Sequence, residues 1–387
     1  MKRMTFAVTL ALIATTAAGQ QELKNVQVLK GLTPGQLFRA MQFISASLGV
    51  TCDFCHVRAA NGELDLPNDA KDEKKTARQM MQLVIDTNVK YFKGQTEVSC
   101  ETCHRGAPNP VSVPVLPIAL VPRPAEAQAA PKPPLPTRDE VVARYAKALG
   151  NLNEKALATM ELKGVREAQQ GKTPIDVVIA PGRMRATGMT PQGEMVNVID
   201  GSSGWVRDAK GTRAMEPNQI ETATMIANAY RPTLPNDIPA NARVHLLTKV
   251  GDRDAYLMVA RFGENGRERL YFDAETGLLV RRIRLTPTPI GLIPQQTDFS
   301  DYREVDGMKL PFVVKVVTVD PRAGATRTYS EIRLNAKTTR RSSRNRSELS
   351  VVGYRSSAPI TDNPSPTRRR AGTRPSASPD TARPCSR

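Results

Sequence analysis

The pentapeptide CDFCH, Cys52–His56, ends the stretch MQFISASLGVTCDFCH, and its pattern returns as CETCH at Cys100–His104. Each copy places two thiols three residues apart and an imidazole directly after the second thiol. The chain has 387 residues but only five cysteines and three histidines, so the two copies hold most of both residue types. Such a concentration of rare residues in one repeated pattern indicates a chemical site.

The C-x-x-C-H pattern is typical of covalent haem c attachment. In this interpretation the thiols add to the two vinyl groups of one haem, and the following histidine binds the iron. Two alternatives stay open, because the four thiolates could hold one zinc ion or form structural disulfides. Neither alternative requires a histidine after each pair, so the sequence favours two covalently bound haem c groups. The predicted cofactor-binding residues are Cys52, Cys55, His56, Cys100, Cys103 and His104.

Apolar residues recur at helical spacing upstream of each motif. One helix is expected over residues 34–48, and a second over residues 71–91. Each predicted helix carries a methionine, Met41 in the first and Met80 or Met81 in the second. A thioether can serve as the second axial ligand of haem iron, and core packing is the alternative role for a methionine on such a face.

Residues 20–110 resemble one half of the cytochrome c subunit of photosynthetic reaction centres. The resemblance is carried by the stretch that ends in CDFCH, by ARQMM at 77–81 and by VSCETCHRGAPNP at 98–110. It implies that each haem packs parallel to a helix that supplies an axial methionine, Met41 for the first haem and Met80 for the second. The family's full member has four haems and this chain has two motifs, so the resemblance favours electron transfer more than photosynthesis.

The N-terminus is expected to be a secretory signal peptide. Lys2 and Arg3 precede a short apolar stretch that ends in small residues near Gly19, the pattern of a segment cleaved on export. The stretch is too short to span a bilayer comfortably, although an uncleaved N-terminal anchor is the alternative. We therefore predict a periplasmic protein from which residues 1–19 are removed.

The rest of the chain divides by composition. A helical dihaem domain is expected at 20–106, and a linker at 107–136 holds 10 of the 30 prolines, which favour an extended, semi-rigid segment. Short alternating runs broken by Gly, Asp and Pro predict an antiparallel sheet in a domain at 137–336. The predicted fold class is multidomain α plus β: a helical c-type dihaem module followed by an antiparallel β half-barrel-like domain.

The β domain is more loosely similar to periplasmic lipoprotein carriers and outer-membrane lipoprotein-sorting proteins. This similarity rests on a capped helix at 137–150, the series of short strands and the stretches FDAETGLLVRR and DYREVDGMKLPF. It implies a curved sheet whose concave side can hold an acyl chain or a protein partner. No catalytic set is recognisable there, and the third histidine, His245, is expected to be structural.

The formal net charge of +17 is unevenly distributed. Residues 337–387 contain 12 Lys and Arg against three Asp and Glu, so more than half of the positive excess lies in this segment. Its Arg, Ser, Pro and Thr content predicts a disordered basic tail, which is either solvated, bound to an acidic partner or an artefact of the sequence. No basic motif with interleaved aromatic residues occurs, so nucleic acid is not an expected partner.

These features predict a periplasmic dihaem c-type cytochrome that transfers single electrons through two His/Met-ligated haems. Its expected partners are redox proteins, with a lipid or lipoprotein at the β domain. The alternative is a lipid- or lipoprotein-binding protein whose cytochrome module acts as a sensor. A haem enzyme would need an open coordination position on the iron, and electron transfer is favoured over catalysis.

Overall fold

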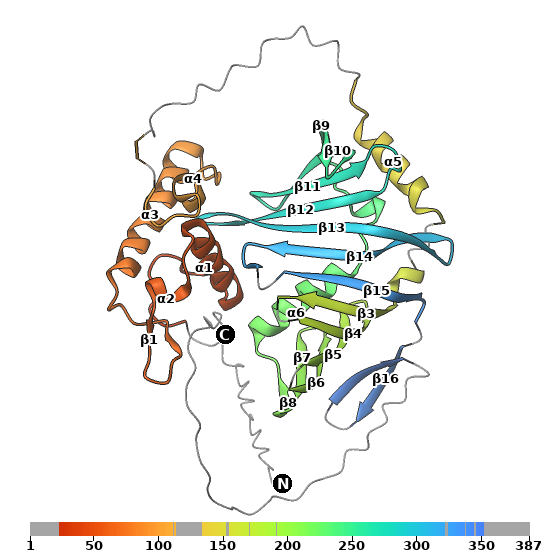
Figure 1. The fold of residues 1–387 in the computed structure, drawn as a ribbon, viewed down its shortest axis with the longest axis horizontal. Coiled ribbons are helices and arrows are strands. Elements are labelled where there is room, and N and C mark those ends of the chain that lie inside the picture. Colours follow the sequence, from red (N-terminus) through yellow and green to blue (C-terminus); the bar gives the residue numbers. More distant parts are fainter. Residues whose placement is uncertain are drawn as a thin grey trace, which may run out of the picture.

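The computed structural model describes residues 23–110, 112–113, 134–151, 155–169, 171–190, 192–321, 324–336, 338–343 and 346–351. These residues form a helical module, residues 23–110, and a β domain, residues 134–336, which lie side by side (Figure 1). The predicted signal peptide, most of the proline-rich segment and residues 352–387 lie outside the described residues. No helix in the described part of the chain is both long and apolar enough to cross a bilayer.

The helical module contains two long helices, each followed by a short helix at a C-x-x-C-H motif. The first long helix starts with a capping box, in which the Thr33 and Gln36 side chains each accept from the other residue's N–H. It ends at Gly49, whose φ of 66° is left-handed. A Cβ atom at this position would collide with the Gly106 carbonyl oxygen, so only glycine fits. The elements are α1 Pro34–Leu48, α2 Cys52–Cys55, β1 Val57–Arg58, β2 Leu64–Asp65, α3 Asp72–Phe92 and α4 Cys100–His104.

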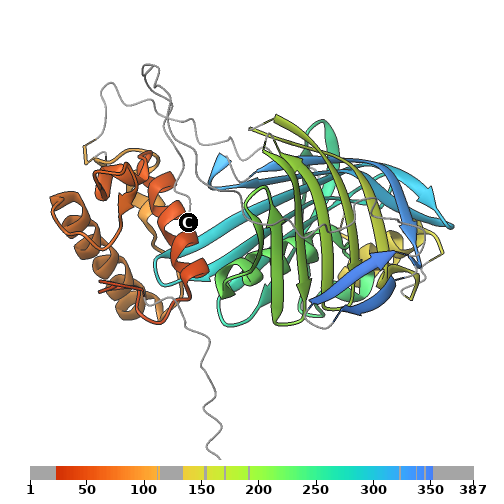
Figure 2. The ribbon, with the colours of Figure 1, turned by 90° about the horizontal axis from the view of Figure 1, so that it is seen from below.

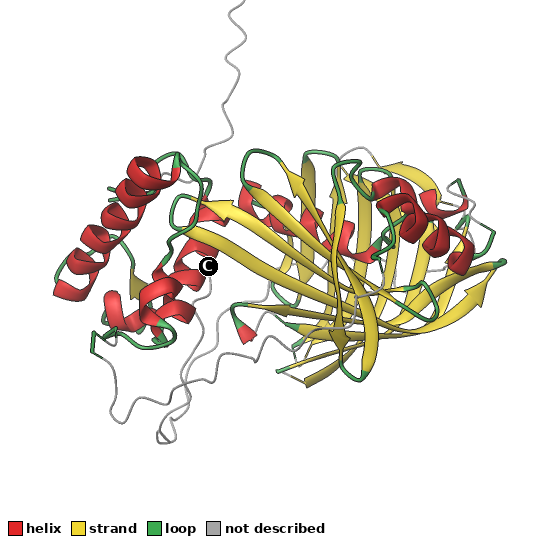
Figure 3. Cartoon of the chain, turned by 90° about the horizontal axis from the view of Figure 1, so that it is seen from above, coloured by secondary structure: helices red, strands yellow, loops and turns green. Residues whose placement is uncertain are grey.

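Thirteen strands of the β domain form one antiparallel sheet in the order β8-β7-β6-β5-β4-β3-β15-β14-β13-β12-β11-β10-β9. Two meanders therefore meet where β3 pairs with β15. The sheet curves around its helices as a half-barrel (Figures 2 and 3), with β8 and β9 as its edges. The elements are α5 Arg138–Leu149, η1 Ala156–Ala158, β3 Met160–Ala168, β4 Gly171–Ala180, β5 Arg183–Thr190, β6 Gly193–Asp200, β7 Ser203–Asp208, β8 Gly211–Ala214, α6 Pro217–Tyr230, η2 Pro235–Asp237, β9 Arg243–Val250, β10 Arg253–Phe262, β11 Gly266–Asp273, β12 Leu279–Thr288, β13 Gly291–Val305, β14 Met308–Thr318 and β15 Ala325–Leu334.

The concave side of the sheet holds the core of the β domain. In β14 every second residue from Met308 to Val316 is buried, as expected for a sheet with one covered face. Tyr145 of α5 packs on Phe272 of β11 with ring centroids 5.2 Å apart. The Tyr145 hydroxyl donates to the Thr233 carbonyl oxygen at 2.6 Å, so its polar end is also satisfied.

The helical module and the β domain share a second, smaller core. Ile290 and Ile293, beside the turn between β12 and β13, are buried together with Phe43, Met81 and Cys100 of the helical module. Polar contacts bridge the same boundary: Gln42 with Asp320 (3.0 Å), Arg267 with Glu97 (2.8 Å) and Asn265 with the Gly94 carbonyl (3.4 Å). The proline-rich segment therefore connects two docked parts, whereas its composition predicts a linker that separates them.

The two predicted long helices of the helical module are confirmed, and the described part of the basic tail contains a hairpin. The helix expected at 34–48 has these bounds, and the helix expected at 71–91 runs from residue 72 to residue 92. Composition predicts disorder from residue 337, whereas β16 Thr338–Ser343 and β17 Arg346–Val351 pair as an antiparallel hairpin. The hydrogen bonds of a hairpin join backbone N–H and C=O groups, which every residue except proline carries. Side-chain composition alone therefore does not predict them.

Candidate functional site

The first C-x-x-C-H motif forms one helical turn, α2. The His56 N–H closes this turn by donating to the Cys52 carbonyl oxygen at 3.0 Å. At the start of the turn the Thr51 hydroxyl donates to the Asp53 carboxylate, and this bond lowers the pKa of that carboxyl. Both thiols and the imidazole thus belong to one five-residue unit, as the attachment of a single haem requires.

The His56 side chain, directly after α2, is half-buried. Its Nδ1 atom is shielded from solvent and has no hydrogen-bond partner among the described residues. Burial lowers the pKa of His56, and the charge of the nearby Lys74 ammonium lowers this pKa further. The neutral imidazole, the form in which histidine binds a metal, is therefore favoured.

The loop between the first motif and α3 is tied to that helix by basic side chains. Lys74 Nζ donates to the Leu66 and Asn68 carbonyl oxygens at 2.7 and 2.8 Å. Arg78 and Lys74 each pair with Asp69 at 2.8 Å, and these bonds hold the pKa of Asp69 well below its usual range. The sequence does not single out these residues, because lysine and arginine on a helix are mostly exposed.

The second motif forms α4, which begins at the N-cap Ser99. Cys100 is buried, and its burial raises the pKa of its thiol to about 11. Cys103 is exposed. The His104 Nδ1 atom lies 3.0 Å from the Ala107 carbonyl oxygen. When Nδ1 carries the proton it donates to this oxygen, and Nε2 keeps its lone pair for a metal, as metal-binding histidines commonly do.

The chain that leads into α4 is fixed by Asn88, a residue outside the set predicted from the sequence. Asn88 is buried, and its side-chain oxygen accepts from the Glu97 N–H at 3.1 Å. A signal was available, because Asn88 continues the apolar face of α3 seven residues after Met81 and four after Val84. A polar residue in such a position needs a partner, here the chain next to the second motif.

The three candidate methionines differ in their surroundings. Met81 is 8% exposed and lies in the shared core with Cys100, and Met41 packs against the same core. Met80 is 41% exposed. The structure therefore brings Met41 and Met81 together near the second motif and leaves Met80 at the surface of α3.

The four motif cysteines do not pair with one another. Cys55, Cys100 and Cys103 are free thiols, and Cys52 is disulfide-bonded outside the two motifs. No group of three or more His, Cys, Asp and Glu side chains in this part of the chain is placed to hold a metal ion. The third histidine, His245, is exposed on the edge strand β9.

Residues 6–129 match the family model described as "Photosynthetic reaction centre cytochrome C subunit". This part of the chain resembles the reaction-centre cytochromes. Cytochrome c-554 of Chloroflexus aurantiacus is 38% identical over 94 residues, which cover 22% of this chain and 21% of that relative. The photosynthetic reaction center cytochrome c subunit of Thermochromatium tepidum is 34% identical over 104 residues, 25% of this chain and 24% of that relative.

The chain spans about a quarter or less of the length of these cytochrome relatives. Both C-x-x-C-H motifs lie inside the range that the cytochrome family matches. The similarity supports a c-type cytochrome and implies covalently bound haem c.

Solved structures also resemble the chain. A LolA superfamily protein from Nitrosomonas europaea has 9% sequence identity and a TM-score of 0.33, with 52% of this chain and 94% of that chain covered. A DUF1329 family protein from Desulfovibrio piger has 11% identity and a TM-score of 0.33, with 51% and 92% covered. The assignment of a half-barrel rests on the strand order and curvature described above.

Proposed function

We propose that the chain is a periplasmic dihaem c-type cytochrome that transfers single electrons. The observation that carries this proposal is the form of the two motifs, because each places two cysteines and one histidine on a single short helix or directly after it. Bound haem would supply one-electron redox chemistry at each motif. The residues that would hold the first haem are Cys52, Cys55 and His56, and those for the second are Cys100, Cys103 and His104.

The environments of the two histidines fit this role. His56 has a shielded ring nitrogen without a hydrogen-bond partner among the described residues. The bond from His104 to the Ala107 carbonyl fixes the orientation of its ring. Both rings would act as proximal ligands and hold the iron at the turn that carries the thiols.

Met41 and Met80 are our proposed distal ligands. The exposure of Met80 supports its role, because Leu83 and Tyr91 on the same side of α3 are also 58% and 67% exposed. Residues three and eleven positions apart share one side of a helix, so α3 presents an apolar stripe to solvent. A flat apolar haem packed along this stripe would remove it from water. Met81 is a buried member of the shared core and would stabilise the fold, whereas Met41 is only partly buried against that core and is our proposed ligand for the first haem.

Haem content tests the number of haems directly. The full chain would be matured in a host with a c-type assembly system, and bound haem would be counted by haem-stained denaturing electrophoresis and pyridine haemochrome spectra. We expect two haems per chain. Replacing Cys52 and Cys55 by alanine, or Cys100 and Cys103, should leave one haem, and the control Cys385→Ala should keep two. Colourless protein, or zinc bound by the paired thiols, would contradict the proposal.

The periplasmic location is supported by the N-terminal sequence pattern, with its basic start, short apolar stretch and small residues. N-terminal sequencing of the mature protein should find a start near Gln20 in the periplasmic fraction. Recovery of a chain that still begins at Met1 would contradict cleavage and support an N-terminal anchor.

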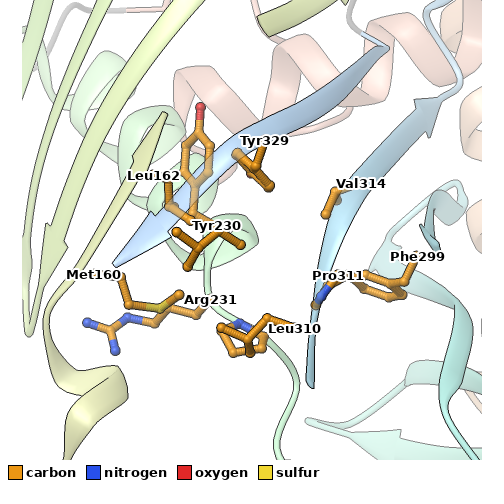
Figure 4. Close-up of a pocket in the computed structure, with 11 residues that line it drawn as sticks. Met160, Leu162, Tyr230, Arg231, Phe299, Leu310, Pro311, Val314 and Tyr329 are labelled. Atoms are coloured by element: carbon orange, nitrogen blue, oxygen red, sulfur yellow. The ribbon is translucent and has the colours of Figure 1, made fainter. Parts of the chain in front are cut away.

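Binding of a lipid or lipoprotein by the β domain is a second candidate function. The half-barrel holds a cavity lined mainly by apolar side chains (Figure 4). Its volume of about 20 Å³ is room for roughly one water molecule, so an acyl chain would have to displace side chains. Mass spectrometry of organic extracts should find acyl lipid in the purified protein and lose it in Val314→Trp. Lipid-free protein would argue against this function.

A further inference from the structure

Two arginines lie directly opposite each other inside the half-barrel. Arg327 of β15 pairs in register with Arg166 of β3, so their side chains leave the sheet on the same face. This is the concave face, because Tyr329, two residues after Arg327, belongs to the core of the β domain. The Arg327 guanidinium also lies over the ring of Tyr230, at the end of α6, with 4.9 Å between its Cζ atom and the ring centroid.

Neither arginine has a carboxylate partner among the described residues. Arg327 is 8% exposed, and its Nε atom is buried without a hydrogen-bond partner. Arg282 of β12, opposite the core residue Leu270, is paired with Glu268 at 2.6 Å. The sheet therefore supplies an acidic partner to this inward-facing arginine, and it omits one at the pair of Arg166 and Arg327.

The pair is unfavourable in the absence of an anion. Like charges directly opposite in a sheet repel each other, and a buried guanidinium without a partner bears the full cost of leaving water. Burial and the charge of Arg327 lower the pKa of Arg166. The Tyr230 ring offers a cation–π contact, which supplies no negative charge.

We propose that Arg166 and Arg327 form a binding site for an oxyanion, either a carboxylate or a phosphate. Guanidinium groups bind both through parallel N–H···O bonds, and two facing guanidinium groups can share one anion. Tyr230 and Tyr329 also line the cavity of Figure 4, so the anion site borders the apolar interior. The proposal does not depend on haem binding. If the β domain binds a lipid, as in the second candidate function, the site predicts that this lipid carries a negative charge.

Calorimetric titration of the full haem-loaded chain with four probes tests the site. Inorganic phosphate and acetate represent free oxyanions, dodecanoate represents an oxyanion on an apolar chain, and dodecanol is the uncharged control. We expect phosphate or dodecanoate to bind and dodecanol not to bind. Arg166→Gln and Arg327→Met should each weaken that binding at least tenfold, whereas Arg269→Gln, at an exposed arginine of β11, should leave it unchanged.

The source of the oxyanion follows from the same titrations. If dodecanoate binds much more tightly than acetate, the natural ligand of the site is a carboxylate on a lipid. If phosphate alone binds, the natural ligand is a free anion. That second result would count against lipid binding by the β domain and not against the anion site. If neither phosphate nor dodecanoate binds, or if both arginine variants bind like the wild type, the proposed site is overturned.

Thermal unfolding separates a binding role from a structural role of Arg327. In buffer free of phosphate and carboxylates, Arg327→Met should unfold at a temperature equal to or above that of the wild type, because it removes an unpaired buried charge. Addition of the bound anion should raise the Tm of the wild type and not that of the variant. A variant that unfolds earlier in both buffers would show that Arg327 serves the fold alone.

Discussion

Asn88 and Val98 are joined by hydrogen bonds in both directions. The Asn88 amide donates to the Val98 carbonyl oxygen at 2.7 Å, and the Val98 N–H donates to the Asn88 side-chain oxygen at 2.9 Å. Asn88 is only 4% exposed, so solvent cannot take over these bonds. One side chain of α3 thereby fixes the position of the second C-x-x-C-H motif.

Replacing Asn88 by alanine should destabilise the helical module and impair the second motif. Three backbone groups would lose their partner in a buried place, so the free energy of unfolding should fall by about 2–4 kcal/mol. Haem content should fall toward one per chain. Urea denaturation and pyridine haemochrome spectra measure the two effects. Gln82→Ala, at an exposed position of α3, is the matched control and should change neither quantity.

Met80 and Met81 should respond oppositely to truncation. Met81→Ala opens a cavity in the shared core and should lower the free energy of unfolding by about 2–5 kcal/mol, with both Met–iron absorption bands retained. Met80→Ala should cost little stability, because Met80 is exposed, but it should alter the spectrum and potential of one haem. The reverse pattern would identify Met81 as the ligand.

Gly291 should be intolerant of a side chain. A Cβ atom there would lie 2.5 Å from the Phe43 ring and 3.1 Å from the Ser99 Cβ. Gly291→Ala should therefore loosen the contact between the two parts and lower the free energy of unfolding by about 1–3 kcal/mol. Hydrogen exchange of α1 and β13 would locate the effect. Gly188→Ala, where the nearest atom is 3.6 Å away, is the control, and equal effects of both substitutions would contradict the prediction.

Asp69 should make stability depend on pH in the acid range. Its bonds with Arg78 and Lys74 hold its folded-state pKa below that of the unfolded chain, which is about 4. The stabilisation is therefore present above pH 4 and is lost as the pH falls through the folded-state pKa. Asp69→Asn should be less stable than the wild type at pH 7, and the difference should shrink below pH 4. Denaturation measured at several pH values checks this prediction. A difference in the free energy of unfolding between wild type and Asp69→Asn that is the same at every pH would disprove the coupling.

Local features of the sequence predicted local structure well. The Thr33 capping box and the stop at Gly49 depend on neighbouring residues, so α1 could be placed correctly. The alternation of β14 likewise follows from one covered face. The two motifs could be found because their chemistry is contained in five consecutive residues.

Features that depend on long-range register could not be predicted. The contact of Ile290 with the helical module, and the meeting of Arg166 with Arg327, join segments separated by more than 100 residues. The choice between Met80 and Met81 likewise depends on which side of α3 faces the core. Helical periodicity places these adjacent residues about 100° apart and does not say which direction is buried.

The shared core around Ile290 and Ile293 bears on what happens if the backbone is cut. Because apolar contacts, one ion pair and two hydrogen bonds already hold the helical module on the half-barrel, a protease nick between residues 111 and 133 would yield two fragments that stay associated. The fragments could also be produced separately and mixed to reconstitute the assembly. The covalent connection would then serve chiefly to bring the two parts together during folding.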